Sequence, residues 1–178
     1  MREKNRILIT GLPGCGKTTL IKRIAAHIRV PYCGFFTNEI RSGGNRVGFE
    51  IETFTGTKGI LSHIDIQSSY HVGKYGVDVL GFQKIAIPEM EKALSSGHLL
   101  IIDEIGKMEL CSDMFRDMLE KAFRSSVGII ATILFKPHPF CDRLKNNKDT
   151  EVIVLTKGAQ EQVFKALVDR FLSLRIDH

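Results

Sequence analysis

The sequence predicts an α/β fold in which a mostly parallel β-sheet is covered by helices on both faces. Short apolar runs that are unbroken rather than alternating recur at RILIT (6–10), LLIID (99–103), GIIATIL (128–134) and EVIVL (151–155). Strands that are covered on both faces show this pattern. Stretches with helical periodicity lie between the runs, and a repeated order of strand and helix is typical of an α/β protein.

Apolar residues recur at a helical period in the stretches 20–28, 115–123 and 163–172. We expect a further helix over about 83–95, with Pro88 near its first turn, where proline is tolerated. KPHPF (136–140) predicts a loop that leads into a short basic helix. These helices alternate with the apolar runs, as the fold class requires.

Residues 34–62 interrupt the order of strand and helix. They contain the short extended pieces GFFTNEI, VGFEIETF and KGILSH, which are separated by SGGN and TGT turns. Short extended pieces joined by tight turns are typical of antiparallel strands. We therefore expect an antiparallel β insertion around 34–62.

The length of 178 residues suits one domain with a sizeable core and is short for two. Apolar and charged fractions of 43% and 25% are near globular averages, and no repeat occurs, which argues against disorder and solenoids. No linker rich in Gly, Ser or Pro divides the chain. We predict a single domain over 1–178, and we expect a monomer.

The first residues, MREKNRILITG, are basic, but their apolar run of four residues is too short for a signal peptide or a membrane span. A cytoplasmic protein without membrane association is therefore expected. The four cysteines lack C-x-x-C spacing and the six histidines form no close pairs. Neither a zinc site nor a disulfide framework is indicated, so free thiols are predicted.

The formal net charge of +5 fits either nucleic acid or a small polyanionic substrate. No dense run of Lys and Arg with interleaved aromatic residues occurs, so nucleic acid is the less favoured partner. A small polyanion explains the mild excess of positive charge equally well.

Residues 11–18, GLPGCGKT, match G-x-x-x-x-G-K-[ST] directly after a predicted strand and directly before an amphipathic helix. Gly11, Gly14 and Gly16 let the backbone bend so that successive N–H groups point inward. The dipole of the following helix adds partial positive charge where β- and γ-phosphates would lie. The alternative is a glycine-rich turn that only caps a helix.

Side chains at the end of this loop add the remaining phosphate chemistry. Lys17 contributes a full positive charge, and the hydroxyl of Thr18 would ligate Mg²⁺, which prefers oxygen and bridges phosphate oxygens. The predicted nucleotide-binding stretch also includes Leu12, Pro13, Cys15 and Thr19.

The apolar run 99–103 ends on two adjacent carboxylates, Asp103 and Glu104. Like charges repel and are costly to bury, so a positive partner is expected there. Asp103 fits a second nucleotide motif whose carboxylate holds the magnesium shell, while Lys17 offsets its charge. Glu104 is placed to orient or deprotonate the attacking water. The alternative is a pair of strand-end acids in a solvated loop.

Four other residues carry weaker signals. Lys107 is a candidate cation for charge that develops on the γ-phosphoryl group, or a solvated loop lysine. Thr132 is either a polar sensor of the γ-phosphate or a satisfied core threonine. Arg143 is either a lid residue that reaches phosphate or, the favoured reading, a surface arginine. Cys15 lies at a helix start, which favours thiolate, but no base or second cysteine makes it catalytic.

Three other classes of P-loop protein are alternatives for these motifs. Asp103 to Gly106 matches the D-x-x-G of GTPases, but the nearest string to N-K-x-D, at 147–150, has its aspartate one position early. Nucleotide or nucleoside kinases need an acceptor site, often rich in arginine, and DEIGKMEL (103–110) offers none. A nucleotide-dependent switch without catalysis is the third alternative. Water is the simplest acceptor.

A glutamate directly after the magnesium aspartate resembles the RecA-like and related additional-strand ATPases. More of the chain carries a family resemblance, in GLPGCGKTTL, GFFTNEIRSGGNRVGFEI, VGKYGVDV, IPEME, IIDEIGKMEL and IIATI. These segments resemble the small P-loop nucleoside-triphosphatases of thermophiles and their relatives, which include the human cancer-related nucleoside-triphosphatase. DEIGKMEL after a P-loop is specific to that family.

The resemblance implies a three-layer, RecA-like P-loop fold and slow, Mg²⁺-dependent hydrolysis of ATP, GTP, CTP and UTP to diphosphates. It also implies loose base selectivity, since the matched residues address phosphates and metal. One segment departs from the family. Where the family has T-x-E-N-R near the C terminus, this chain has TKGAQE (156–161), so the family's contacts to the base or ribose are not carried over to this segment, whereas the phosphate chemistry is.

Overall fold

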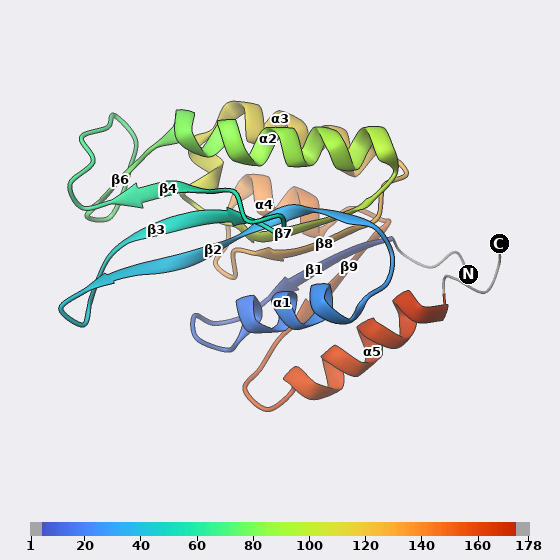
Figure 1. Ribbon diagram of the computed structural model, residues 1–178. Helices are drawn as coiled ribbons and strands as arrows, with labels where there is room; N and C mark the ends of the chain where they lie inside the picture. The colour runs from blue at the N-terminus through green and yellow to red at the C-terminus, as the bar shows by residue number, and fades with distance from the viewer. Residues whose placement is uncertain (1–4, 174–178) are drawn as a thin grey trace.

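Residues 5–173, the part of the chain that this computed structural model describes, fold around one sheet of nine strands (Figure 1). The strand order is β5-β6-β4-β3-β2-β7-β8-β1-β9. The strands are β1 (Arg6–Thr10), β2 (Tyr32–Ser42), β3 (Asn45–Thr53), β4 (Lys58–His63), β5 (His71–Val72), β6 (Tyr75–Val77), β7 (Leu99–Ile105), β8 (Ile129–Ile133) and β9 (Thr150–Val154). The single domain predicted over 1–178 also includes 1–4 and 174–178, which lie outside the described residues.

The strands β2, β7, β8, β1 and β9 are parallel to one another. β8 lies between β1, which leads into the P-loop, and β7, which carries Asp103. β8 is therefore the additional strand of the RecA-like arrangement, and the predicted α/β P-loop fold is confirmed. Because the carboxyl ends of parallel strands meet at one edge, the P-loop and the end of β7 share that edge.

The predicted insertion continues this same sheet. Residues 32–36 of β2 pair in parallel with β7, while residues 35–42 pair antiparallel with β3. β4, β6 and β5 extend the antiparallel half. The antiparallel pieces were predicted, but β5 and β6 were not, because strands of two and three residues are too short to show periodicity.

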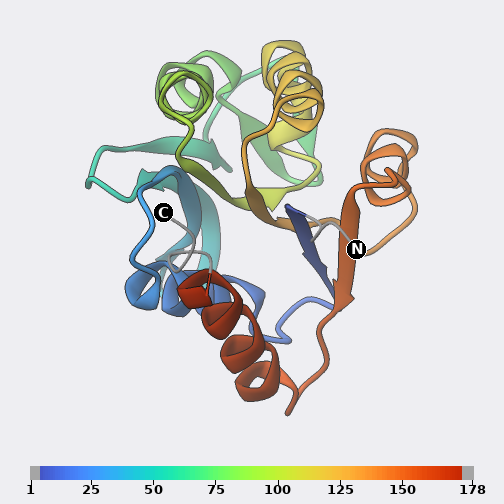
Figure 2. The same ribbon diagram turned by 90° about the vertical axis from the view of Figure 1, so that its right-hand side faces the viewer.

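Helices cover both faces of the sheet. The helices are α1 (Lys17–His27), α2 (Val79–Ser96), the 3₁₀ turn η1 (Glu109–Cys111), α3 (Asp113–Arg124), α4 (Pro139–Lys145) and α5 (Gln160–Ser173). α2 and α3 lie on one side of the sheet, and α1 and α5 lie on the other (Figure 2). Among residues 5–173, no helix has both the length and the apolar character that crossing a membrane requires.

The central strands send side chains into two cores. Leu100 and Ile102 of β7 belong to the core beneath α2 and α3, whereas Leu99 and Ile101 belong to the core beneath α1 and α5. Neighbouring residues of a strand point to opposite faces. Because both faces are covered, every residue of β1 and β8 is buried, which explains the unbroken apolar runs.

Helix α2 is longer than predicted. It begins at Val79 rather than near 83, because the Asp78 side chain caps it by accepting a hydrogen bond from the Gly81 amide at 2.8 Å. Pro88 therefore lies inside the helix, not in its first turn. The other predicted helices are α1, α3, α4 and α5. All four cysteines are free thiols, as predicted.

Candidate active site

The P-loop connects β1 to α1. β1 is buried throughout, and Leu20, Ile21 and Ile24 anchor α1 against the sheet, so both ends of the loop are fixed. Gly14 and Gly16 have φ angles of 76° and 94°, in the left-handed region that favours glycine. The sequence therefore specifies a rigid turn whose following helix begins at Lys17.

The amine of Lys17 folds over the loop. Its Nζ donates hydrogen bonds to the carbonyl oxygens of Gly11 at 3.0 Å and Leu12 at 3.3 Å. The positive charge of Lys17 thus lies within the turn that is predicted to bind phosphates. Thr18 and Thr19 follow in the first turn of α1.

A cavity of about 500 Å³ lies between the P-loop, the β2–β3 hairpin and the end of β7. It is lined by Pro13, Gly14, Gly16, Lys17, Thr18, Thr19, Thr37, Asn38, Glu39, Arg46, Phe49 and Glu104. The structure thus brings Lys17 and Glu104 to one space, although 87 residues separate them in the sequence. Sequence reasoning missed the residues of the hairpin, because their place depends on how β2 and β3 pair.

Asp103 is 1% exposed at the end of β7. Thr132 of the neighbouring strand β8 donates a hydrogen bond from Oγ1 to Asp103 Oδ1 at 2.5 Å. Asp103 Oδ2 is buried without a hydrogen-bond partner among the described residues. Burial raises the pKa of Asp103, while the nearby hydroxyls of Thr132 and Thr18 and the charge of Lys17 oppose this rise.

This oxygen chemistry fits Mg²⁺. The orphaned Oδ2 of Asp103 and the hydroxyl of Thr18 are hard oxygen ligands, and Mg²⁺ is usually held by one or two carboxylates together with substrate phosphates. Within residues 5–173, no group of three or more His, Cys, Asp or Glu side chains is arranged to hold a metal by itself. A bound phosphate would have to complete the shell.

Glu104 borders the cavity and is partly buried. Burial raises the pKa of its carboxyl, the charge of Asp103 raises it further, and Lys17 lowers it. The peptide bond between Asp103 and Glu104 is cis. A carboxylate in this environment has the basicity to accept a proton from a water in the cavity.

Glu109 is a second acid near Glu104 that sequence reasoning missed. A Cβ atom on Gly106 would lie 2.9 Å from Glu109 Oε2 and 3.0 Å from Glu104 Oε1, so both carboxyl groups converge on this glycine. Glu109 is 5% exposed, and burial, together with the charge of Glu104, raises its pKa to about 8. Its position between Met108 and Leu110 was the available signal, because an acid among apolar residues is unusual.

The weaker candidates lie in different surroundings. Lys107 is exposed in the turn after β7 and is not among the residues that line the cavity. Thr132 is fully buried and contacts Asp103. Arg143 of α4 is exposed and pairs with Glu120 at 3.2 Å, which agrees with the reading as a surface arginine. Cys15 is buried beneath the loop.

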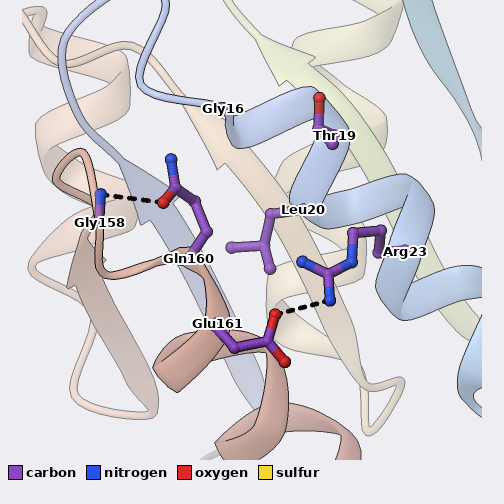
Figure 3. A pocket seen from close by; sticks show the side chains of 7 residues that line it. All are labelled: Gly16, Thr19, Leu20, Arg23, Gly158, Gln160 and Glu161. Carbon is purple, nitrogen blue, oxygen red and sulfur yellow. Dashed lines mark hydrogen bonds and ion pairs between the residues drawn. The ribbon is translucent and has the colours of Figure 1, made fainter.

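A second cavity, of about 380 Å³, lies beside the first turn of α1, where TKGAQE returns to the P-loop (Figure 3). Gln160 donates from Nε2 to the Cys15 carbonyl at 2.8 Å and accepts from the Gly158 amide at 3.0 Å. Arg23 and Glu161 form an ion pair at 2.8 Å across the opening. The segment that departs from the resemblance therefore still contacts the loop.

Residues 6–168 match the model of a protein family described as NTPase. The chain belongs to this family. It is 42% identical over 163 residues to the nucleoside-triphosphatase THEP1 of Thermotoga petrophila, and the match covers 92% of this chain and 90% of that protein. The predicted family resemblance is thus confirmed.

Two solved structures of the NTPase family are similar to this chain over nearly its whole length. The crystal structure of THEP1 from Aquifex aeolicus matches with a TM-score of 0.87 and 36% identity, covering 93% of this chain and 98% of that chain. The solution structure of a human cancer-related nucleoside triphosphatase matches with a TM-score of 0.82 and 33% identity, covering 96% and 98%. The fold described above is therefore the fold of the NTPase family.

Proposed function

We propose that this chain hydrolyses nucleoside 5′-triphosphates (ATP, GTP, CTP and UTP) to diphosphate and phosphate, with Mg²⁺ as cofactor. One observation carries the proposal: Lys17 of the P-loop and the carboxylate of Glu104 border the same cavity. Membership of the NTPase family supports the class of reaction.

The phosphates would bind at the start of α1. The backbone N–H groups of residues 11–16, except Pro13, which has none, and the charge of Lys17 would hold the β- and γ-phosphates, and the helix dipole adds to their field. Thr18 and Asp103 would hold Mg²⁺, with Thr132 fixing the orientation of Asp103. Bound Mg²⁺ would neutralise part of the negative charge of the β- and γ-phosphates.

Glu104 would align a water for attack in line with the bond to be broken. A bond forms between the water oxygen and the γ-phosphorus, the bond from that phosphorus to the bridging oxygen breaks, and Glu104 accepts the proton of the water. We keep Lys107, which follows Gly106 in the same turn, as a proposed cation for the γ-phosphoryl group.

The second cavity supports loose base selectivity. Both ends of the Gln160 amide are already bonded to the backbone, and Arg23 Nη2 pairs with Glu161 Oε2. A base beside Thr19 and Leu20 would therefore meet a Gln160 amide that is already occupied. A binding site rejects a wrong base strongly only when that base leaves polar groups of the site without hydrogen-bond partners.

Transfer of labelled γ-phosphate tests the proposal. The protein is incubated with γ-labelled ATP and Mg²⁺, alone and with a panel of nucleosides and monophosphates. Labelled inorganic phosphate without acceptor is the expected product. Label on an acceptor, with little free phosphate, would identify a kinase instead. If neither product forms and ATP changes the affinity of the protein for another macromolecule, the protein is a nucleotide-dependent switch.

We also propose a single monomeric domain over 1–178 that acts in the cytoplasm on small triphosphates rather than on nucleic acid. Light scattering of the purified protein tests the monomer, and fractionation of the source cells tests the location. Competition of an unlabelled RNA with ATP hydrolysis tests the exclusion of nucleic acid.

A further inference from the structure

The β2–β3 hairpin forms the wall of the active-site cavity that faces the P-loop. Thr37, Asn38 and Glu39 of β2 and Arg46 and Phe49 of β3 line this wall. Figure 1 shows the hairpin extending from the sheet on the side where the P-loop precedes α1. A triphosphate held by the loop would therefore have this hairpin on its other side.

Arg46 is held in place by three different strands. Its Nη1 donates to Glu39 Oε1 of β2 at 2.9 Å, and its Nε donates to the Tyr75 hydroxyl of β6 at 3.1 Å. The centre of its guanidinium lies 5.1 Å from the ring centroid of Phe49 on β3. These contacts occupy Nε and Nη1, which leaves Nη2 without a hydrogen bond among the described residues.

Arg41 on the same hairpin differs in this respect. Its Nε and Nη2 both donate to Glu39 Oε2, and its Nη1 donates to the Gly44 carbonyl at 3.1 Å. All three nitrogens of Arg41 are thus bonded within the hairpin, and Arg41 does not line the cavity. The contrast indicates that Arg46 has a donor to spare for a ligand, whereas Arg41 is a structural partner of Glu39.

The distribution of cationic side chains around the cavity indicates a role for Arg46. Among the residues that line it, Lys17 and Arg46 are the two with cationic side chains, and they come from opposite walls. In phosphoryl transfer, charge is spread over three equatorial oxygens of the γ-phosphoryl group, so one cation on the loop side leaves other oxygens uncompensated. A guanidinium offers paired donors that match phosphate oxygens.

We propose that Arg46 is a catalytic residue that contacts the γ-phosphoryl group from the hairpin side, and that Glu39 and Tyr75 are its positioning residues. This inference rests on the proposed hydrolysis of triphosphates. Because the guanidinium is fixed before substrate binds, it stabilises developing charge without reorganisation.

The test compares Arg46→Ala and Arg46→Lys with Arg124→Ala as the control, because Arg124 is an exposed arginine at the end of α3 that does not line the cavity. Steady-state turnover of ATP is measured together with calorimetric binding of ADP·Mg²⁺ and of ADP·Mg²⁺ with aluminium fluoride, which mimics the γ-phosphoryl group in transfer. Arg46→Ala is expected to lower kcat by about 10²–10³-fold, the usual effect of losing one preorganised donor.

The binding measurements distinguish a catalytic role from a structural one. Arg46→Ala should weaken the fluoride complex by about 10²-fold and ADP by no more than about threefold, because the contact is made mainly in the transition state. Arg46→Lys should recover part of kcat, since it keeps the charge but not the fork of donors. Arg124→Ala should stay within about threefold of wild type, because Arg124 makes an exposed ion pair away from the cavity.

Three results would overturn the proposal: unchanged kcat in Arg46→Ala, equal loss of ADP and of the fluoride complex, or Arg124→Ala as impaired as Arg46→Ala. If Arg46→Ala does not fold, as judged by circular dichroism, Arg46→Lys decides, and wild-type kcat in that variant counts against the role. A wild-type protein that releases no phosphate from any triphosphate would refute the proposed function instead. Active wild type with an unaffected Arg46→Ala would refute only this inference.

Discussion

At the scale of single residues, neighbouring side chains determine the orientation of Asp103 and offset the charge of the two adjacent acids. Thr132 orients one oxygen of Asp103 and leaves the other free, and Lys17 offsets the charge that two adjacent acids bring into a buried strand end. The proposed cation would make the pairing of Asp103 and Glu104 tolerable, because it would share the same small volume.

Glu104→Gln should separate binding from chemistry. The amide keeps the size of the side chain but cannot accept the proton of the attacking water, so we expect turnover to fall by roughly 10²–10⁴-fold. Calorimetry with ATP·Mg²⁺ should show nearly normal affinity, whereas Lys17→Ala, as a comparison, should lose affinity as well. Wild-type turnover in Glu104→Gln would remove this residue from the mechanism.

Thr132→Val should weaken the proposed metal site without opening a cavity. Valine has nearly the same shape but donates no hydrogen bond, so Asp103 would lose the partner of Oδ1. Loss of such an outer partner usually costs about 10–100-fold in metal affinity or activity. The concentration of Mg²⁺ that gives half-maximal turnover is the quantity to measure. Thr132→Ser keeps the hydroxyl, and a serine variant as impaired as valine would contradict the explanation.

Glu109 should make the stability of the nucleotide-free protein depend on pH. Its pKa is about 8 in the folded chain against a usual 4.5, so the folded state binds the proton more tightly than the unfolded state. The resulting stabilisation is complete below pH 4.5 and is lost as pH rises through 8. One pKa unit corresponds to about 1.4 kcal/mol, so the full loss is roughly 3–5 kcal/mol.

Glu109→Gln should therefore gain stability relative to wild type as the pH rises from 6 to 9. Urea denaturation without Mg²⁺ or nucleotide, repeated across this range, gives both free energies of unfolding. The amide still accepts the backbone hydrogen bonds of Gly106 and residue 109. Parallel curves for the two proteins would show that this carboxyl does not titrate as described.

At the scale of elements, two short connections determine where the chemistry lies. The P-loop is fixed because β1 is buried on both faces and α1 is anchored, and in the turn after β7 the carboxyl groups of Glu104 and Glu109 converge on Gly106. The hairpin contributes Arg46 because β2 pairs with β7 along one edge and with β3 along the other, and its pairing with β3 continues beyond its pairing with β7.

Helix α2 provides a test of stability away from the site. Asp78→Ala removes the N-cap that accepts from the Gly81 amide, and the loss of such a cap costs about 0.5–2 kcal/mol. Chemical denaturation should show this decrease with an unchanged dependence on denaturant. Asp117→Ala on the exposed side of α3 serves as the control. Equal stability of Asp78→Ala and wild type would mean that the cap does not start the helix.

At the scale of the whole molecule, the sequence predicts the parts that local pattern determines. The runs at 6–10 and 99–103 identify β1 and β7 because burial on both faces makes them continuously apolar, and the P-loop is readable because its spacing is fixed by phosphate geometry. The mostly parallel sheet and the family were confirmed by the topology and by the NTPase match.

Features that depend on distant contacts could not be predicted in this way. The raised pKa of Glu109 depends on the turn that brings its carboxyl group near Glu104. The position of Arg46 at the cavity depends on how the hairpin pairs. Proline favours the first turn of a helix, so Pro88 predicts a start near 83, whereas Asp78 caps α2 further upstream. Roles of the site residues stay predictions.

The central claim is that the P-loop and the acidic end of β7 enclose one metal-bound triphosphate. A crystal structure of Glu104→Gln with ATP and Mg²⁺ tests it most directly. We predict one Mg²⁺ at about 2.0–2.1 Å from the Thr18 hydroxyl, with Asp103 in its shell directly or through a bound water, and the γ-phosphate between Lys17 and residue 104. A triphosphate bound elsewhere, or a metal remote from Thr18 and Asp103, would contradict the account.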